Sequence, residues 1–302
     1  MYKVSVSVPA VCTHLGPGYQ VLGLALNLRN TVEMRLSSDD RLTVEVRGEG
    51  RDALPTDVYN PAVRAAIKVF QRLEQAPAGL HVRCLNEVPF GAGLAAHTTL
   101  AIGGLVGANN LLGSPFSHDD LIEMAAALSG EGAACVTAMR GGLGICSRDG
   151  DSILYRAIEI TPLRVVVALP ALPGGTLGRA AALPSSVALA DAVHHIGRTA
   201  LLIEALREGD VRLLRRVMDD RLREPACRET IPGYAAVIAA ARDAGALAVT
   251  LCGEGPALLA FAAYNHAAVE HAMRAAFAGA GVEARTWSLS SDLQGVVISV
   301  VE

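Results

Sequence analysis

The segment that most constrains the fold of this chain runs from Pro9 to Gln20 and has the sequence PAVCTHLGPGYQ. It follows directly after Val4–Val8, where valines alternate with serines as in a half-buried strand. Further motif-like segments follow in order: Leu54–Asp57 with Asn60 and Arg64, Val88–His97, Thr176–Arg179 with Arg228–Gly233, and Leu251–Pro256. Segments in a fixed order along the whole chain form a specific signature, whereas any one of them alone would be weak.

Together these segments resemble the signature of homoserine kinases, a branch of the GHMP small-molecule kinase superfamily. The usual opening motif of that branch is PATSANLGPGFD, and this chain keeps its proline, leucine and glycine frame. The resemblance covers nearly the whole chain. It implies an α+β fold in two domains: an N-terminal domain over residues 1–158, similar to ribosomal protein S5 domain 2, and a ferredoxin-like C-terminal domain over residues 159–302.

The composition fits a metabolic enzyme with a small-molecule substrate. The net charge is −4 and aromatic residues make up 4% of the chain, which argues against a nucleic-acid partner. No apolar run reaches the ~18 residues of a spanning helix, so we expect no membrane partner. The cysteines lack C-x-x-C spacing, which disfavours a structural zinc site and favours a reducing compartment, the cytoplasm. We also expect a homodimer.

Hydrophobic periodicity predicts strands and helices in both halves of the chain. Period-two alternation at 31–35 and 43–47 predicts half-buried antiparallel strands. Helical spacing predicts a helix over 61–73 and a buried, glycine-dotted helix over 98–112. In the second half, the predicted helices are 187–207, 211–221 and 234–244, and the predicted strands are 163–169, 248–251, 257–262, 284–289 and 296–300.

Val88–His97 takes the place of the family's phosphate loop, P-x-G-x-G-L-G-S-S. Such a loop points backbone N–H groups and a helix N-terminus at phosphate oxygens. Gly91 and Gly93 are kept, but Ala95 replaces the last glycine, and Ala96 and His97 replace the serines that carry the phosphate and magnesium contacts in the family. We expect a remodelled ligand pocket with a changed loop shape. The alternative is a turn that only joins a strand to a helix.

The residues that serve phosphoryl transfer in the family are also replaced. Whichever way Met124–Gly142 is aligned, the magnesium-binding glutamate and the Asp-Asn pair near the phosphoacceptor become alanine, cysteine or valine. Glu254 places a carboxylate in the second glycine loop, where it would repel phosphate. These substitutions predict no cofactor and no metal site. The alternative keeps ATP and Mg, with Glu123 or Glu131 as a metal ligand.

The substrate side keeps its basic residues. Arg179 and Arg228 stand where the family's two arginines bind the substrate carboxylate, and a guanidinium holds a carboxylate bidentately. His14 and Gln20 replace the Asn and Asp that hold the amine in the family. We therefore expect a small carboxylate substrate. Further residues expected to line its site are Thr176, Cys135 and Cys252.

Cysteines and histidines suggest a replacement chemistry. A thiol beside a histidine or a helix N-terminus has a lowered pKa and can act as a nucleophile. Cys12 with His14 is the predicted catalytic pair, and His97 and Glu254 are predicted proton-transfer groups. A lone cysteine is more often a small buried hydrophobic residue, which is the alternative at each of these positions.

The sequence therefore favours an enzyme that has lost ATP phosphotransfer and acts on a small carboxylate as a lyase, isomerase or hydrolase. Two alternatives stay open. One is a divergent ATP-dependent homoserine kinase that phosphorylates a small hydroxy amino acid. The other is a non-catalytic protein that binds a metabolite.

Overall fold

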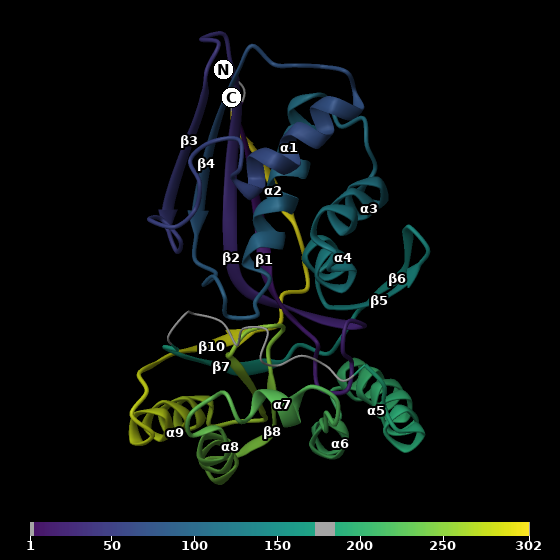
Figure 1. Ribbon diagram of the computed structural model, residues 1–302, viewed down its shortest axis with the longest axis vertical. Coiled ribbons are helices and arrows are strands. Elements are labelled where there is room, and N and C mark those ends of the chain that lie inside the picture. The colour runs from purple at the N-terminus through teal and green to yellow at the C-terminus, as the bar shows by residue number, and fades with distance from the viewer. Residues whose placement is uncertain (1–2, 173–184, 302) are drawn as a thin grey trace.

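The computed structural model describes residues 3–172 and 185–301, and within them two sheets follow one another along the long axis of the molecule (Figure 1). Thr176 and Arg179 lie outside the described residues. None of the described helices is long and apolar enough to cross a membrane.

The first sheet has seven strands in the order β11-β1-β2-β4-β3, with β5 paired to β2 and β6 paired to β5. Its strands are β1 (Lys3–Thr13), β2 (Leu22–Ser37), β3 (Leu42–Gly48), β4 (Gly79–Asn86), β5 (Leu143–Asp149), β6 (Ser152–Ile158) and β11 (Val297–Val301). The prediction that 43–47 is an antiparallel strand is wrong, because β3 pairs parallel with β4. A helix connects these two strands and returns the chain in the same direction, as a parallel pair requires.

Strand β1 changes character along its length. The predicted alternation is confirmed at its start, where Val4 and Val6 are buried and the residues between them are half-buried. From Val8 onward every residue is buried. Val11 packs into the core of the first sheet, whereas Ala10 and Cys12 pack into a second core shared with the other half of the chain. The end of β1 is therefore covered on both faces.

Four helices cover one face of the first sheet (Figure 1). They are α1 (Pro61–Arg72), α2 (Ala96–Leu111), α3 (His118–Ser129) and α4 (Gly132–Arg140). The predicted buried helix is confirmed as α2, and its glycines allow close packing: a Cβ on Gly104 would lie 2.0 Å from the carbonyl oxygen of Ala62 in α1. Asn60 caps α1 by accepting a hydrogen bond from the Ala62 N–H.

The second sheet has the order β10-β7-β9-β8. Its strands are β7 (Arg164–Pro170), β8 (Ala246–Leu251), β9 (Leu258–Ala262) and β10 (Ala284–Ser290). One face packs on α8 (Tyr234–Asp243) and α9 (His266–Gly279), and the other packs on α5 (Leu189–Glu208), α6 (Val211–Val217) and the end of β1. The short helix α7 spans Glu224–Cys227.

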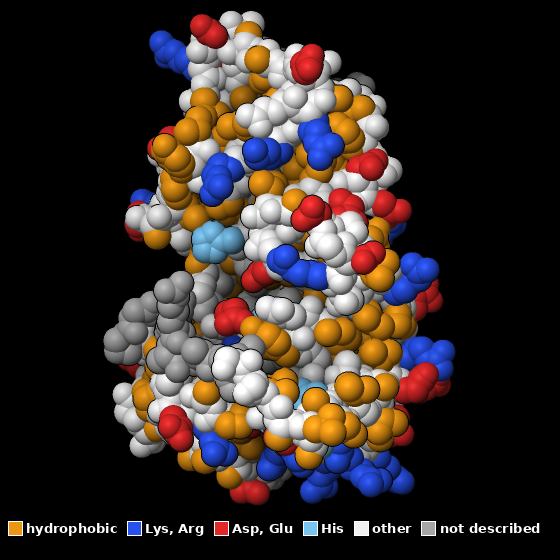
Figure 2. All heavy atoms as spheres, turned by 45° about the vertical axis from the view of Figure 1, so that its right-hand side comes forward, with side chains coloured by type: hydrophobic (Ala, Val, Ile, Leu, Met, Phe, Trp, Pro, Cys, Tyr) orange, Lys and Arg blue, Asp and Glu red, His pale blue; other side chains and the backbone are white. Residues whose placement is uncertain are grey.

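The chain changes sheets between β6 and β7, but its last strand returns to the first sheet. β11 pairs antiparallel with β1, so the end of the chain packs with the N-terminal half. The domain boundary at residue 158 stays a prediction, and so does the homodimer. The outer face of α5 leaves large apolar side chains exposed, namely Leu189, Val193 and Ile196 (Figure 2).

Candidate active site

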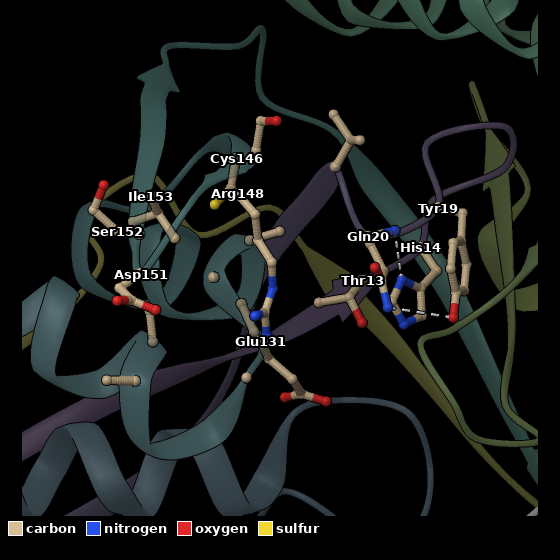
Figure 3. A pocket seen from close by; sticks show the side chains of 18 of the residues that line it. Thr13, His14, Tyr19, Gln20, Glu131, Cys146, Arg148, Asp151, Ser152 and Ile153 are labelled. Carbon is tan, nitrogen blue, oxygen red and sulfur yellow. Dashed lines mark hydrogen bonds between the residues drawn. The ribbon is translucent and has the colours of Figure 1, made fainter.

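The surface is indented where the two halves of the molecule meet (Figure 2), and a cavity of about 730 Å³ lies there. Its walls come from the turn between β1 and β2, the start of α4, the β5–β6 hairpin and the loop after β8. Figure 3 shows His14, Tyr19 and Gln20 on one side of it, Arg148 and Glu131 in the middle, and Asp151 and Ser152 on the far side. A smaller cavity of about 260 Å³ lies beside Arg64, His97 and Thr98, and Glu131 lines both cavities.

His14 is held in place by contacts to both of its ring nitrogens. Its Nδ1 accepts a hydrogen bond from the Gln20 backbone N–H at 2.9 Å, and its Nε2 lies 2.9 Å from Oε1 of Glu254. The ring also stacks on Tyr19, with centroids 4.5 Å apart. Since Nδ1 is an acceptor, the proton of the neutral ring lies on Nε2 and is donated to Glu254. This hydrogen bond lowers the pKa of Glu254, so its carboxylate is ionised at neutral pH.

Cys12 does not form a thiol–imidazole pair with His14. Its side chain is fully buried, and its Sγ lies 3.0 Å from Sγ of Cys252. Neither cysteine lines the large cavity. Burial raises the pKa of Cys252, which opposes thiolate formation. Cys135 is also buried, and burial raises its pKa to about 12.

The glycine loop before α2 has left-handed backbone at Gly91, Gly93 and Ala95, with φ values of 73°, 84° and 58°. Ala95 therefore has a left-handed φ despite its Cβ. No side chain caps the first turn of α2, so its N–H groups point at the loop without an internal side-chain partner. A Cβ on Gly93 would lie 1.8 Å from the carbonyl oxygen of Cys252, so this loop and the Cys252–Gly255 loop touch backbone to backbone.

Thr98 and Glu131 form a contact that spans the two cavities. Thr98 Oγ1 donates to Oε2 of Glu131 at 2.7 Å, and Glu131 stands at the N-cap of α4. The described residues contain no group of three or more His, Cys, Asp or Glu that could hold a metal alone. Mg²⁺ needs fewer protein ligands when phosphates complete its shell. The sequence named Glu131 as an alternative metal ligand but not Thr98, because the family's serines align with Ala96 and His97, just before Thr98.

His97 is exposed at the rim of the smaller cavity and packs edge-on against Phe90 at 4.9 Å. Partial desolvation lowers its pKa, so the ring is neutral at neutral pH. It does not line the large cavity that holds His14 and Glu254. The four predicted catalytic residues are therefore divided: His14 and Glu254 face the large cavity, His97 faces the small one, and Cys12 is in the core.

The basic residues around the cleft differ from those the sequence singled out. Arg228 is exposed at the end of α7 and does not line the large cavity, so its role stays a prediction. Arg148 projects into the large cavity from the β5–β6 hairpin (Figure 3). Sequence reasoning missed it, although Asp149-Gly150 is a hairpin-turn signal that could have placed it. Arg223 is buried and does not line the large cavity either.

Comparison with protein families matches both halves of the chain. Residues 60–142 match the GHMP kinases N terminal domain, and residues 202–279 match GHMP kinases C terminal. Among curated proteins, the homoserine kinase of Moorella thermoacetica is 39% identical over 97% of this chain and 99% of its own length. The homoserine kinase of Nostoc punctiforme is 34% identical over 97% of each chain.

Solved structures give the same result. The crystal structure of homoserine kinase from Cytophaga hutchinsonii superposes with a TM-score of 0.88 at 25% identity, covering 98% of this chain and 97% of that one. A more distant structure, described as MDDEF in complex with MVAPP, AMPPCP and magnesium, has a TM-score of 0.66 at 15% identity and covers all of both chains.

Proposed function

Because the chain belongs to the GHMP kinase family, in its homoserine kinase branch, we propose that it transfers the γ-phosphoryl group of ATP to the hydroxyl group of a small amino acid such as homoserine. The two-domain α+β fold expected from the sequence is that of the family. An enzyme of kinase type follows from the same relatives. The acceptor is part of the proposal.

The sequence-based prediction of a nucleotide-independent lyase, isomerase or hydrolase without a cofactor is wrong. Relatives that match almost the full chain are homoserine kinases, and a protein of the same fold binds AMPPCP and magnesium. The prediction judged each replaced position separately. The structure provides a hydroxyl one residue further along, at Thr98, and pairs the carboxylate of Glu254 with His14.

The N-terminus of α2 fits the phosphate groups of a nucleotide. Its first-turn N–H groups have no side-chain cap, and the positive end of the helix dipole lies there. The left-handed conformations at Gly91, Gly93 and Ala95 build the preceding loop. Arg64 and His97 line the adjoining small cavity. These contacts come mainly from the backbone, so they survive the loss of the family's serines.

Thr98 and Glu131 fit a magnesium ion, and their contact is the observation that carries the proposal. The pair offers a hydroxyl and a carboxylate oxygen, both hard ligands, between the two cavities. When bound, Mg²⁺ neutralises charge on the phosphate oxygens. Glu131 would hold the ion from α4, and Thr98 would hold it from the first turn of α2.

The large cavity fits the acceptor. Glu254 is ionised and gives only Oε1 to His14, so its carboxylate can also accept a hydrogen bond from the ammonium group of an amino acid. His14 holds Glu254 in position and keeps its proton on Nε2. Phosphoryl transfer depends mostly on positioning, and the fixed His14–Glu254 pair provides it on the acceptor side.

Product identification tests the proposal. Wild-type protein incubated with ATP, Mg²⁺ and L-homoserine should form ADP and O-phosphohomoserine, as measured by a coupled ADP assay and phosphorus NMR. Glu131→Gln should lower kcat at least about 100-fold, because it weakens the metal site. Glu123→Gln is the matched control: Glu123 lies in the middle of α3, accepts a backbone hydrogen bond from Ile153 and should keep nearly full activity.

Two results would contradict the proposal. One is the absence of ADP formation with homoserine, serine and threonine. The other is an equal loss of activity in Glu131→Gln and Glu123→Gln, which would remove Thr98–Glu131 as the metal site.

A further inference from the structure

Arg29 and Arg223 are both largely withdrawn from solvent, but among the described residues only Arg29 has hydrogen-bond partners for its Nη atoms. Arg29 donates to Asp292, to the hydroxyl and carbonyl oxygens of Ser7, and to the carbonyl oxygen of Gly295. Arg223 is only 2% exposed, yet its Nη1 and Nη2 have no hydrogen-bond partner in the described part of the chain. A buried charge without a partner costs several kcal/mol, so native structures seldom keep one without a reason.

Asp220, an acidic residue close to Arg223 in sequence, already has other partners. Asp220 lies three residues before Arg223, and its Oδ1 accepts the backbone N–H groups of Leu222 and Arg223 at 2.8 and 3.0 Å. Its Oδ2 accepts the N–H of Glu224 at 3.2 Å. Asp220 therefore caps the turn that leads into α7 and leaves the guanidinium unpaired.

Arg223 lies close to the acceptor end of the large cavity. Its positive charge acts on Tyr19 and Glu254, both of which line that cavity, and on Cys252 and Cys227. Arg223 does not itself line the cavity, but its positive charge thus acts on an anion, Glu254, that does. This arrangement complements a zwitterion, whose carboxylate and ammonium groups are separated by a single carbon atom.

We propose that the guanidinium of Arg223 binds the carboxylate of the acceptor, using Nη1 and Nη2 together. A guanidinium presents parallel N–H groups that match the two oxygens of a carboxylate. Glu254 then takes the ammonium group, so the site selects an α-amino acid. The proposed kinase function supplies the identity of the acceptor, whereas the anion site follows from Arg223 itself. A phosphate group fits less well, because the Glu254 carboxylate would repel it.

Calorimetry on the nucleotide-free protein separates the carboxylate from the rest of the ligand. Wild type should bind L-homoserine about 10- to 100-fold more tightly than L-homoserine amide, which keeps the ammonium and the hydroxyl. In Arg223→Met this acid-to-amide ratio should fall to about 1. Arg221→Met is the control: Arg221 is exposed, pairs with Asp191 and Asp219, and should keep the wild-type ratio.

A thermal melt distinguishes a ligand site from a structural role. Removing a lone buried charge should leave Tm of Arg223→Met equal to wild type or higher, whereas a structural arginine would lower it when lost. Arg223→Lys covers the case in which the methionine variant fails to fold. Lysine keeps the positive charge but lacks the paired N–H groups of a guanidinium, so this variant should lower the acid-to-amide affinity ratio several-fold.

Several outcomes would overturn the assignment. The wild-type protein could bind L-homoserine and its amide equally tightly, or bind neither of them. Alternatively, Arg223→Met could keep the wild-type acid-to-amide affinity ratio. A loss of the ratio in Arg228→Met but not in Arg223→Met would move the site to Arg228. A loss of ATP affinity alone in Arg223→Met would assign the anion to phosphate. If no ADP forms while the ratio behaves as expected, the kinase function fails and the carboxylate site stands.

Discussion

The two sides of the cleft differ in whether main-chain or side-chain groups form them. The proposed nucleotide side consists mainly of backbone: a loop with left-handed φ at Gly91 and Gly93, and the uncapped N-terminus of α2. The proposed acceptor side consists of polar side chains: the imidazole of His14, the carboxylate of Glu254 and the guanidinium of Arg223. Backbone contacts tolerate replacement of side chains, whereas charge contacts do not. This difference would explain how the proposed nucleotide side can keep its function where the family's serines are replaced.

The largest expected effect comes from breaking the backbone contact between the two glycine loops. Gly93→Ala should lower the free energy of unfolding by about 2–4 kcal/mol, because φ is +84° and the new Cβ would meet the carbonyl oxygen of Cys252 at 1.8 Å. Chemical denaturation measures the change. Gly113→Ala is the matched control, since Gly113 has the same φ of +84° and nothing within 4 Å of its Cβ position.

The control should cost only about 1 kcal/mol, the conformational part alone. Equal losses in the two variants would show that the glycine loops do not support one another. The description of the nucleotide side as a packed backbone structure would then be wrong.

The sequence predicted the fold well because proline and glycine frames and hydrophobic periods describe the backbone directly. Helix α1 starts at the predicted Pro61, and α2 is the predicted buried helix. The strand at 43–47 was predicted, but its parallel pairing depends on the crossover through α1 and not on its own alternation. Local patterns therefore give the elements, and the connections give their direction.

The site was less predictable because its contacts join residues far apart in sequence. Thr98 and Glu131 are 33 residues apart, and His14 pairs with Glu254 from the other end of the chain. Arg223 stands out only through its burial and through Nη atoms that have no hydrogen-bond partner among the described residues, and no local sequence pattern reveals either. Cys12 is the opposite case, in which closeness in sequence did not give a contact in space. Its position two residues before His14 suggested a catalytic pair, but its Sγ contacts Sγ of Cys252.

A smaller effect is expected on the proposed acceptor side, from the hydrogen bond between His14 and Glu254. The hydrogen bond from His14 lowers the pKa of Glu254 below its ordinary 4.5. The contribution of this hydrogen bond to the free energy of unfolding is therefore fully present above pH 4.5, and it is lost as the pH falls through the lower pKa of the folded state. Since Glu254 is largely exposed, the pair should contribute less than about 1 kcal/mol.

Melting curves of wild type and Glu254→Gln at several pH values measure this contribution. The wild type should be slightly more stable at pH 7, and the two curves should converge in acid, once the pH falls below the lowered pKa of Glu254. His14→Gln serves as the partner control and should remove the same pH-dependent difference. A difference that grows as the pH falls would contradict the sign of the pKa shift and the pairing of Glu254 with His14.

The smallest expected effect tests whether the nucleotide side has kept the loop shape that a glycine would give. Ala95 has φ +58° and ψ +33°, a conformation that costs a residue with a Cβ about 1–2 kcal/mol. Ala95→Gly removes that strain but adds the conformational entropy of glycine in the unfolded chain, about 0.5–1 kcal/mol, so the net gain in stability should be about 0.5 kcal/mol.

Ser114→Gly is the matched control, because Ser114 has φ +61° in the loop between α2 and α3, outside both cavities. Both variants should gain similar stability in chemical denaturation, and both should keep KM for ATP within about twofold of wild type, because the loop already has a left-handed φ at Ala95. A tenfold fall in KM for ATP in Ala95→Gly alone would show that the alanine had reshaped the loop, and the nucleotide side would then be as sensitive to side-chain replacement as the acceptor side.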